Sequence, residues 1–248
     1  MKDTDPGAAA LDALAAAGPF FAVAAHGSCG PPPGSPWRPL SEAVGDPAVL
    51  RRRVDGVRAY LAGAAGRPAG GVELRVAASA AHLGLVARVL SPFFALAALG
   101  GAPRVPALSE LYWVPEPGGA FPLSLPRTCL AGPDGSVPES AGPVLDGLVA
   151  PLTEAVAGLS VPRTTLRGNA ASAVNGARAA LTAALPHTAD PAARTARAFL
   201  GHPALRGTFD DCGGAAPFRR RSCCLIYRAL PGTGRAAAVC GDCVLAGR

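Results

Sequence analysis

Clustered cysteines constrain this chain more than any other feature of its sequence. Four of the seven cysteines lie near the C-terminus in the pattern Cys-Cys-x15-Cys-x2-Cys: Cys223, Cys224, Cys240 and Cys243. An odd number of cysteines argues against a secreted disulfide framework. Four thiolates, brought together by a turn at residues 231–234, suit a tetrahedral zinc site or an iron–sulfur cluster.

Three features favour iron and sulfide over zinc. Structural zinc sites usually pair two Cys-x₂₋₄-Cys units, and the adjacent Cys223 and Cys224 do not form one. The N–H groups of Gly241 and Asp242 are free to bond cluster sulfurs. Four arginines can offset the negative charge of a four-thiolate [2Fe–2S] centre: Arg219, Arg220, Arg221 and Arg228. The residues alone leave an iron–sulfur cluster, a zinc site, and redox or disulfide chemistry as open alternatives.

The remaining cysteine patterns are weaker. A thioredoxin-like role for Cys240 and Cys243 requires a helix N-terminus in a βαβ unit, which the sequence does not indicate. We expect Cys29, Cys129 and Cys212 to fill small apolar or loop positions. Cys212 is close enough in sequence to the other four cysteines to serve as a spare ligand.

The charge pattern indicates neither nucleic acid nor membrane as a partner. The formal net charge is +6, but the arginines are scattered and no aromatic-interleaved basic stripe is present. The most apolar stretch, residues 76–102, is interrupted by His82, Arg88 and Pro92 and falls short of a membrane span. The first residues are net acidic, where a secretion signal needs positive charge. We therefore expect a cytoplasmic protein with no transmembrane segment and no nucleic-acid partner.

Hydrophobic periodicity predicts a mainly helical α+β protein. A bend or break is expected at Pro92, which lacks an N–H group. Apolar residues recur at helical spacing over residues 48–65, 72–99, 144–159, 166–185 and 191–199, with a short helix at 12–17.

A β-hairpin is expected near residues 108–125. Two short runs rich in aromatic and branched residues flank the turn-forming segment 115–119. Residues 30–39 and 134–143 are expected to be irregular. The predicted domains are a helical body, residues 1–205, and an irregular cysteine-rich, cluster-binding segment, residues 206–248, packed on that body.

Several stretches carry a family resemblance. The ending Ser-Cys-Cys-Leu-Ile-Tyr-Arg at 222–228, followed by Cys-Gly-Asp-Cys at 240–243, resembles the FhuF-like ferric-siderophore reductases, which are [2Fe–2S] proteins. Residues 75–85, continuing through 91–92, and residues 167–173 resemble the same family, especially its actinobacterial members. The opening Gly-Pro-Phe-Phe at 18–21 and the hairpin around Trp113 also fit, so the resemblance covers most of the chain.

The resemblance implies a [2Fe–2S] cluster held by Cys223, Cys224, Cys240 and Cys243. It also implies one-electron reduction of siderophore-bound Fe(III) in the cytoplasm, as part of iron homeostasis. Hard oxygen chelators such as hydroxamates hold Fe(III) far better than Fe(II), so reduction releases the metal. The implied partners are a ferric siderophore, with the hydroxamate type favoured, and an unidentified electron donor. The spacing between the cysteine pairs is longer than in the family, with residues 235–238 as the apparent excess, and such an insertion costs little closure entropy.

Other candidate residues have simpler interpretations beside the functional ones. His82 lies on an apolar helical face and is expected in the core, with a ligand or proton-donor role as the alternative. Asn169 lies near the start of a helix, where a hydrogen bond from its side chain to the backbone accounts for its presence without a function. A role near the cluster is the alternative. Trp113 and Tyr112 are expected to pack rather than to form a siderophore platform. The arginines at 51–53 are expected on a solvated face, whereas those at 219–221 are candidates for cluster tuning or docking.

Two other functions remain open at this point. A zinc site at the four cysteines would only stabilise a non-catalytic binding domain. An iron–sulfur protein could also carry electrons or sense iron without reducing a chelate itself.

Overall fold

A computed structural model describes residues 6–130, 137–210, 218–229 and 240–245 of the chain. The helices are α1 Pro6–Ala16, α2 Glu42–Gly45, α3 Pro47–Ala64, α4 Leu74–Ala98, α5 Val137–Gly142, α6 Ala150–Ala157, α7 Arg163–Ala184 and α8 Ala189–Leu200. A π-helical segment, Pro143–Val149, joins α5 to α6. Short 3-10 turns are η1 Ala69–Gly71, η2 Arg127–Cys129, η4 Pro186–Thr188, η5 Pro203–Leu205 and η6 Ile226–Arg228. The mainly helical α+β class predicted from the sequence is confirmed.

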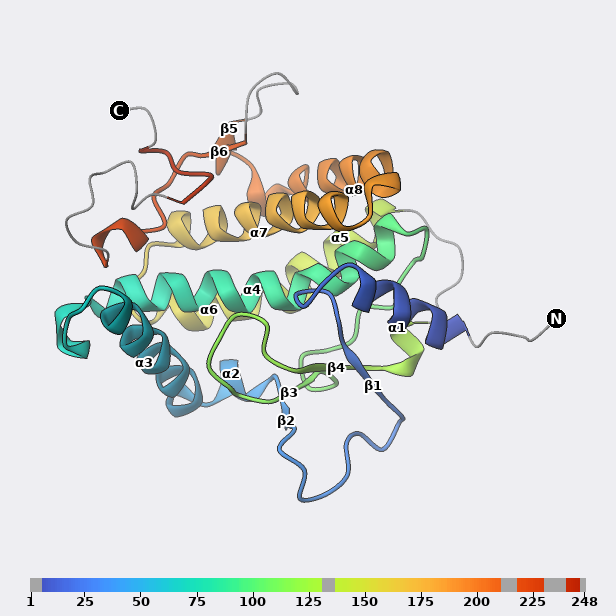
Figure 1. The fold of residues 1–248 in the computed structure, drawn as a ribbon, viewed down its shortest axis with the longest axis horizontal. Coiled ribbons are helices and arrows are strands. Elements are labelled where there is room, and N and C mark those ends of the chain that lie inside the picture. Colours follow the sequence, from blue (N-terminus) through green and yellow to red (C-terminus); the bar gives the residue numbers. More distant parts are fainter. Residues whose placement is uncertain (1–5, 131–136, 211–217, 230–239, 246–248) are drawn as a thin grey trace.

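The fold is built around α4, which is apolar on every side. It packs against α3, α6, α7 and α8, and Figure 1 shows it crossing the middle of the molecule with α7 above it and α6 behind it. A helix that is hydrophobic all round belongs in a core. The helix is not broken at Pro92, because the neighbouring Val89, Leu90, Phe93 and Phe94 are all fully buried and their packing holds the chain helical.

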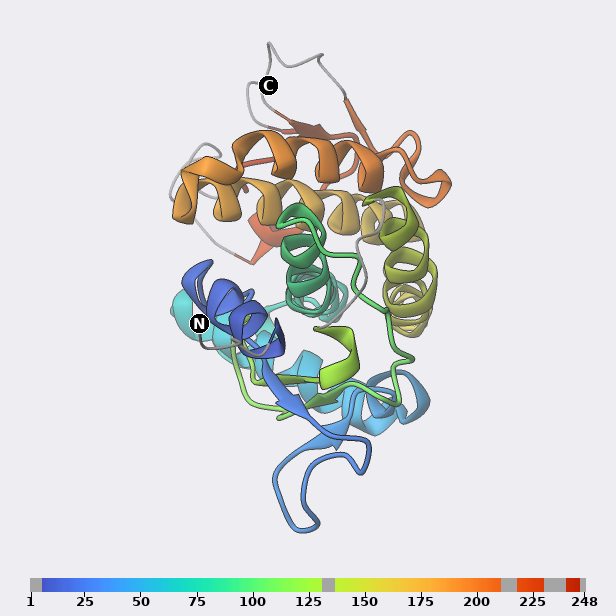
Figure 2. The same ribbon diagram turned by 90° about the vertical axis from the view of Figure 1, so that its right-hand side faces the viewer.

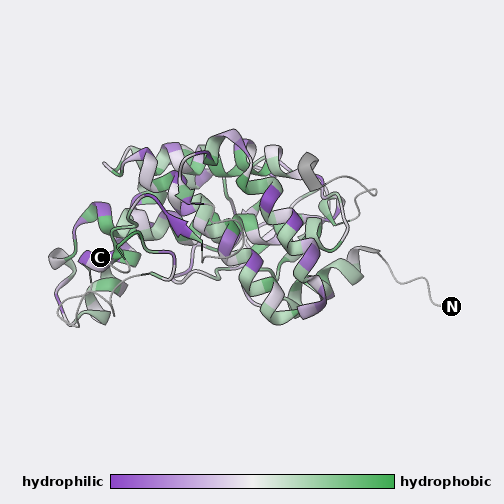
Figure 3. Ribbon diagram, turned by 90° about the horizontal axis from the view of Figure 1, so that it is seen from above, coloured by the Kyte–Doolittle hydropathy of each residue, from purple (hydrophilic) through white to green (hydrophobic). Residues whose placement is uncertain are grey.

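Helix α4 is long and apolar enough to cross a membrane, but 78% of its most apolar window is buried inside the protein. Its apolar surface is therefore already covered by neighbouring helices, as in the core of a soluble protein. Seen from above, hydrophilic residues are scattered over the helices rather than gathered into one stripe (Figure 3).

A small sheet covers the lower side of the helical body. Its strands are β1 Ala24–His26, β2 Arg38–Pro39, β3 Tyr112–Trp113 and β4 Leu123–Pro126, in the order β1-β4-β3-β2. The predicted hairpin is confirmed by the antiparallel pairing of Trp113 with Leu123. Strand β1 is parallel to β4, which the sequence did not indicate.

Two segments expected to be irregular contain regular structure. Arg38 and Pro39 form an edge strand, where a proline is tolerated because no partner needs its missing N–H. Residues 137–142 form α5 rather than a loop, and they pack against α8 and the π-helical segment.

Arg88 joins the central helix to the sheet. Its side chain, 2% exposed, donates from Nε to Phe121 O at 2.8 Å, from Nη1 to Phe20 O at 2.9 Å and from Nη2 to Ala22 O at 2.6 Å. Burial lowers the pKa of Arg88 to about 10. Three carbonyl acceptors satisfy the guanidinium, so this buried cation has a structural role.

The cysteine-rich end of the chain packs on the opposite side from the sheet. Strands β5 Phe209–Asp210 and β6 Arg219–Arg220 pair antiparallel, and η6 follows them. Both ribbon views place this segment against α7 and beside the start of α4 (Figures 1 and 2), and η6 contacts α4 while β6 contacts α7.

Candidate metal centre

The four C-terminal cysteines lie in two short segments on either side of residues 230–239. Cys224 and Cys243 are each 3% exposed, whereas Cys223 and Cys240 are half-buried, and all four are free thiols. The Sγ atoms of Cys224 and Cys240 are 3.5 Å apart. Within the described ranges, no three His, Cys, Asp or Glu side chains are already arranged around one metal-ion position.

Two backbone N–H groups point at cysteine sulfurs. Leu225 N donates to Cys223 Sγ at 3.3 Å, and Leu245 N donates to Cys243 Sγ at 3.3 Å. Leu225 has a φ of 69°, a left-handed conformation that is unusual for a branched residue. These two donors lie two residues after Cys223 and Cys243, and bonds from the N–H groups of Gly241 and Asp242 to cluster sulfurs stay a prediction.

Helix α7 holds the second cysteine segment through Asp242. The carboxylate accepts from Ser172 Oγ at 2.8 Å and from Asn175 Nδ2 at 3.2 Å, and the Asp242 carbonyl accepts from Arg220 N at 3.1 Å. These bonds fix the loop between Cys240 and Cys243 against one face of α7. Sequence reasoning did not single out Ser172 or Asn175, although their spacing of three residues places both on that face.

Helix α4 holds the first cysteine segment. Ser79 Oγ donates to the carbonyl of Cys224 at 2.8 Å, inside the protein. Asn169 of α7 donates from Nδ2 to Ser79 O at 3.0 Å and lies 3.2 Å from Ser79 Oγ. Asn169 is therefore one hydrogen-bonded residue away from the backbone of Cys224, and both helices position that cysteine.

The same network reaches His82, which is fully buried. Thr153 Oγ1 donates to Val149 O at 2.9 Å, so its oxygen is available to accept from His82 Nε2 at 3.1 Å. Nδ1 then carries no proton and faces Asn169 Nδ2 at 3.4 Å. Burial, and secondarily the charge of Arg220, lowers the pKa of His82 to about 3, so the ring is neutral.

Arg220 is the buried member of the four arginines singled out from the sequence. It is 1% exposed, and Nη2 donates to Thr165 O at 3.2 Å. Its Nε and Nη1 are also buried and have no acceptor within the described part of the chain. Burying a cation with unsatisfied donors is costly unless an anion lies nearby.

The other arginines of the group are placed differently. Arg221 pairs with Asp210 at 2.6 Å, and Arg228 pairs with Glu73 at 2.6 Å, with all four side chains more than a third exposed. Arg219 lies in β6 with its backbone paired to Asp210.

The pKa values of the cysteine thiols reflect their closeness to one another and to Arg220. The pKa of Cys224 is lowered to about 6, mainly by the hydrogen bond with Cys240 and to a smaller extent by a backbone hydrogen bond at Ile226 and the charge of Arg220. The pKa of Cys240 is raised, because its thiol bonds Cys224 and a second thiolate would lie beside the first. Burial raises the pKa of Cys223. One thiolate is thus favoured in the free protein, and a metal would be needed to hold the others ionised.

The residues present fit a four-thiolate, anionic iron–sulfur cluster. Four thiols share one region, two backbone N–H groups already donate to sulfur, and a buried guanidinium close to the thiols has two donors without acceptors. A [2Fe–2S] centre on four thiolates is negatively charged, so it would serve as the counter-charge of this guanidinium.

The other cysteines lie apart from this arrangement. Cys129 is buried, and burial raises its pKa to about 11, as for an unreactive core thiol. Cys29 is exposed. Cys212 lies outside the described residues, as do the proposed turn at 231–234 and the excess residues 235–238.

Arg53 departs from its expected position. Arg51 and Arg52 are exposed, but Arg53 is only 9% exposed and donates to the carbonyls of Glu116 and Gly118, with its guanidinium 4.8 Å from the centre of the Phe121 ring. It holds the β3–β4 loop onto α3.

Tyr112 and Trp113 pack as expected, Trp113 in the core and Tyr112 edge-on to His26.

Comparison with known proteins bears on the C-terminal segment. Residues 220–245 match the family model described as the FhuF 2Fe-2S C-terminal domain. The match spans all four cysteines, Arg220 and Asp242. No curated protein and no solved structure matches the chain. Residues 220–245 thus correspond to a [2Fe–2S] domain of the FhuF type, which points to a [2Fe–2S] cluster at these cysteines and is consistent with an FhuF-like family.

Proposed function

We propose that this protein is a cytoplasmic ferric-siderophore reductase that reduces chelated Fe(III) to Fe(II) and so releases the iron. A [2Fe–2S] cluster bound by Cys223, Cys224, Cys240 and Cys243 supplies one-electron transfer. The match of residues 220–245 to the FhuF 2Fe-2S domain carries the proposal. The electron comes from a separate one-electron carrier, and each electron converts one Fe(III) into one Fe(II).

The surrounding residues support this function by holding the thiolates and their charge. Ser79 fixes the carbonyl of Cys224, and Asp242 anchors the other cysteine segment to α7. The cation of Arg220 stabilises added negative charge and so favours a reduced state. The half-buried Cys223 and Cys240 place part of the site near the surface, where a chelate too large to enter the core can approach.

The first test is the metal content of protein purified without oxygen. We expect about two irons and two sulfides per chain, with visible thiolate-to-iron absorption bands. Cys224→Ser should lose the bands, whereas Cys29→Ser, which changes an exposed cysteine outside the segment, should keep them. A colourless protein that binds one zinc and takes up no iron and sulfide would overturn the proposal.

The second test is electron transfer. Protein reduced by dithionite, freed of excess reductant, is mixed with a ferric trihydroxamate while a colorimetric chelator traps Fe(II). We expect one Fe(II) for each protein reoxidised. If the reduced protein keeps its electron in the presence of ferric chelates but passes it to another redox protein, it is an electron carrier and not a reductase.

A further inference from the structure

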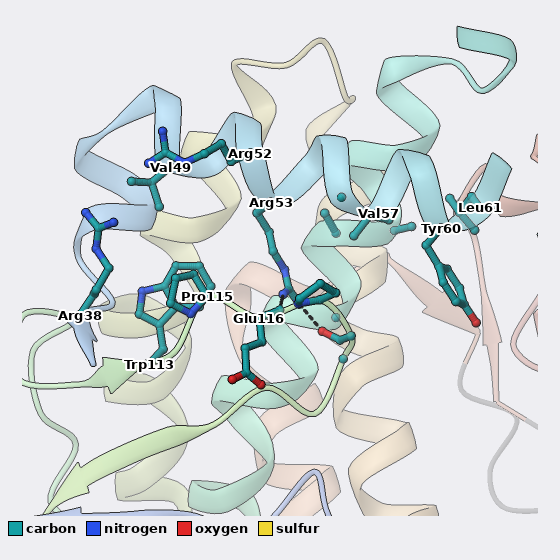
Figure 4. A pocket seen from close by; sticks show the side chains of 17 residues that line it. Arg38, Val49, Arg52, Arg53, Val57, Tyr60, Leu61, Trp113, Pro115 and Glu116 are labelled. Carbon is teal, nitrogen blue, oxygen red and sulfur yellow. Dashed lines mark hydrogen bonds between the residues drawn. The ribbon is translucent and has the colours of Figure 1, made fainter. Parts of the chain in front are cut away.

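A pocket of about 500 Å³ lies between α3, α4 and the β3–β4 loop, a size typical of small-molecule sites. Figure 4 shows α3 along one side, Trp113 and Pro115 at one end, and Tyr60 and Leu61 at the other. Small residues of α4, including Ala80 and Gly84, form part of its wall. Because these residues have little or no side chain, the space beside α4 stays open.

The end of the pocket near Leu61 adjoins the cysteine segment. Val57, Leu61 and Ala80 line the pocket and also belong to a small apolar cluster that contains Ala229 and contacts Leu225. Leu225 directly follows Cys224, and its N–H is bonded to Cys223 Sγ. The pocket and the first cysteine segment are therefore linked through one apolar cluster.

The polar groups of the pocket are mainly cationic. Three arginines line it, Arg38, Arg52 and Arg53, against one carboxylate, Glu116. Arg38 pairs with Glu42 and Arg53 holds the β3–β4 loop, but exposed Arg52 has no ion pair or hydrogen bond among the described residues. Tyr60, 75% exposed, adds an aromatic ring and a hydroxyl at the rim.

Further donors lie just below the pocket surface. The indole N–H of Trp113 and the Nε–H of Arg53 are buried and have no acceptor within the described residues. Both add positive potential to the pocket floor without an acceptor to balance it. An apolar pocket with cationic and N–H groups suits an organic ligand whose polar atoms are negatively charged oxygens.

We propose that this pocket binds the ferric chelate, and that it prefers anionic chelates over neutral or cationic ones. The inference rests on the proposed function, since it places the substrate of that reaction. Three hydroxamates neutralise Fe(III), whereas three catecholates leave the complex strongly anionic. The charge of the pocket thus selects catecholate or carboxylate-rich siderophores rather than the simple trihydroxamates favoured by the sequence.

Binding is tested with Ga(III) chelates, which have nearly the size and the charge of the Fe(III) chelates but are not reduced under mild conditions. Calorimetric titration of the anaerobically purified protein should show that a Ga(III) tris-catecholate binds about tenfold more tightly than a Ga(III) trihydroxamate. Raising the salt concentration should narrow this difference, because the rim charges are exposed. Equal affinity for the two chelates would overturn the preference for anions.

Two variants with matched controls locate the site. Arg52→Glu should weaken tris-catecholate binding about tenfold, whereas Arg51→Glu, an adjacent exposed arginine outside the pocket, should not. Gly84→Leu adds a side chain where nothing lies within 4 Å and fills the pocket, and Gly176→Leu makes the same change in open space on α7. Both glycines are in helices, so leucine should not weaken either helix. Unchanged binding by Arg52→Glu and Gly84→Leu would overturn the pocket assignment.

The design separates failure of the pocket from failure of the reductase. If Gly84→Leu still reduces ferric chelates at the normal rate, the pocket assignment is wrong and the reductase stands. If Ga(III) chelates bind and respond to Arg52→Glu while no ferric chelate oxidises the reduced protein, the pocket stands and the reductase is wrong.

Discussion

Gly168 of α7 lies directly beneath Arg220, so that a Cβ atom at residue 168 would be 3.2 Å from Arg220 Nη2. The same Cβ would overlap the hydroxyl of Ser222, which donates to Thr164 O at 3.0 Å. This close approach lets the β6 strand lie flat on α7. It brings the buried guanidinium and the first cysteine segment against the helix that also holds Asp242.

Enlarging Gly168 should therefore displace the cysteine segment. We expect Gly168→Leu to lower the free energy of unfolding by about 2 kcal/mol relative to Gly176→Leu, which meets open space on the same helix. The iron content of the purified protein should fall in parallel. Thermal unfolding and metal analysis of the two variants check this, and equal stability and iron content would show that the segment does not depend on the contact.

Loss of the Asp242 carboxylate should loosen the second cysteine segment. Asp242→Ala removes the acceptor of Ser172 and Asn175 and leaves both donors of α7 without that partner. We expect the visible absorption of the iron-loaded protein to decay several-fold faster under a competing chelator. Asp210→Ala, which breaks an exposed pair with Arg221, is the control and should leave the decay unchanged.

Arg220 should not be needed for the stability of the free protein, but it should raise the reduction potential of the iron-loaded protein. Arg220→Met removes a buried cation with two unsatisfied donors, so below pH 6, where Cys224 is a neutral thiol, the apo-protein should be as stable as the parent or more stable. In the iron-loaded protein the same change should shift the reduction potential to more negative values, because a nearby positive charge stabilises the added electron. Voltammetry and apo-protein unfolding measure the two effects.

Arg228→Met is the control for that experiment. Its side chain is more than a third exposed and pairs with Glu73, so solvent screens its charge. A potential shift as large for Arg228→Met as for Arg220→Met would mean that total charge, rather than the buried guanidinium, sets the potential.

Local patterns in the sequence were sufficient to locate the cysteine segment and to predict most of the helices. The pattern around Cys223 and Cys240 is contiguous, and helical periodicity predicted α3, α7 and α8 to within a few residues. The prediction that Arg53 lies on a solvated face was wrong, although the helical spacing already indicated burial. It lies four residues from both Val49 and Val57, on the face of α3 that turns inward.

Long-range packing could not be predicted from those patterns. The parallel pairing of Ala24 with Ser124 joins residues far apart in sequence. The burial of Arg220 depends on the small size of Gly168, and neither residue indicates the other. Among three similar arginines in a row, only the tertiary structure distinguishes the buried Arg220 from Arg221, which pairs with Asp210 at the surface.

The neutral His82 should make stability depend on pH. Its pKa is about 3 in the folded protein and about 6.5 in the unfolded chain, so the unfolded state binds more protons between these values. The free energy of unfolding should therefore fall as the pH drops from 6.5 toward 3, with His82 contributing a loss of about 3 kcal/mol at pH 4. Protonation at Nδ1 would also place an N–H group against the N–H donors of the Asn169 amide and a positive charge near the Arg220 cation.

Comparison of variants separates His82 from the carboxylates that titrate in the same range. His82→Gln should flatten the pH dependence of urea-unfolding free energies by that amount, whereas His187→Gln, at an exposed position, should leave it unchanged. Apo-protein is used, so that loss of metal in acid does not contribute. If the profiles of the His82→Gln variant and the parent protein are parallel from pH 7 to pH 4, His82 is not held neutral by burial, and the hydrogen bonds assigned to its two ring nitrogens are wrong.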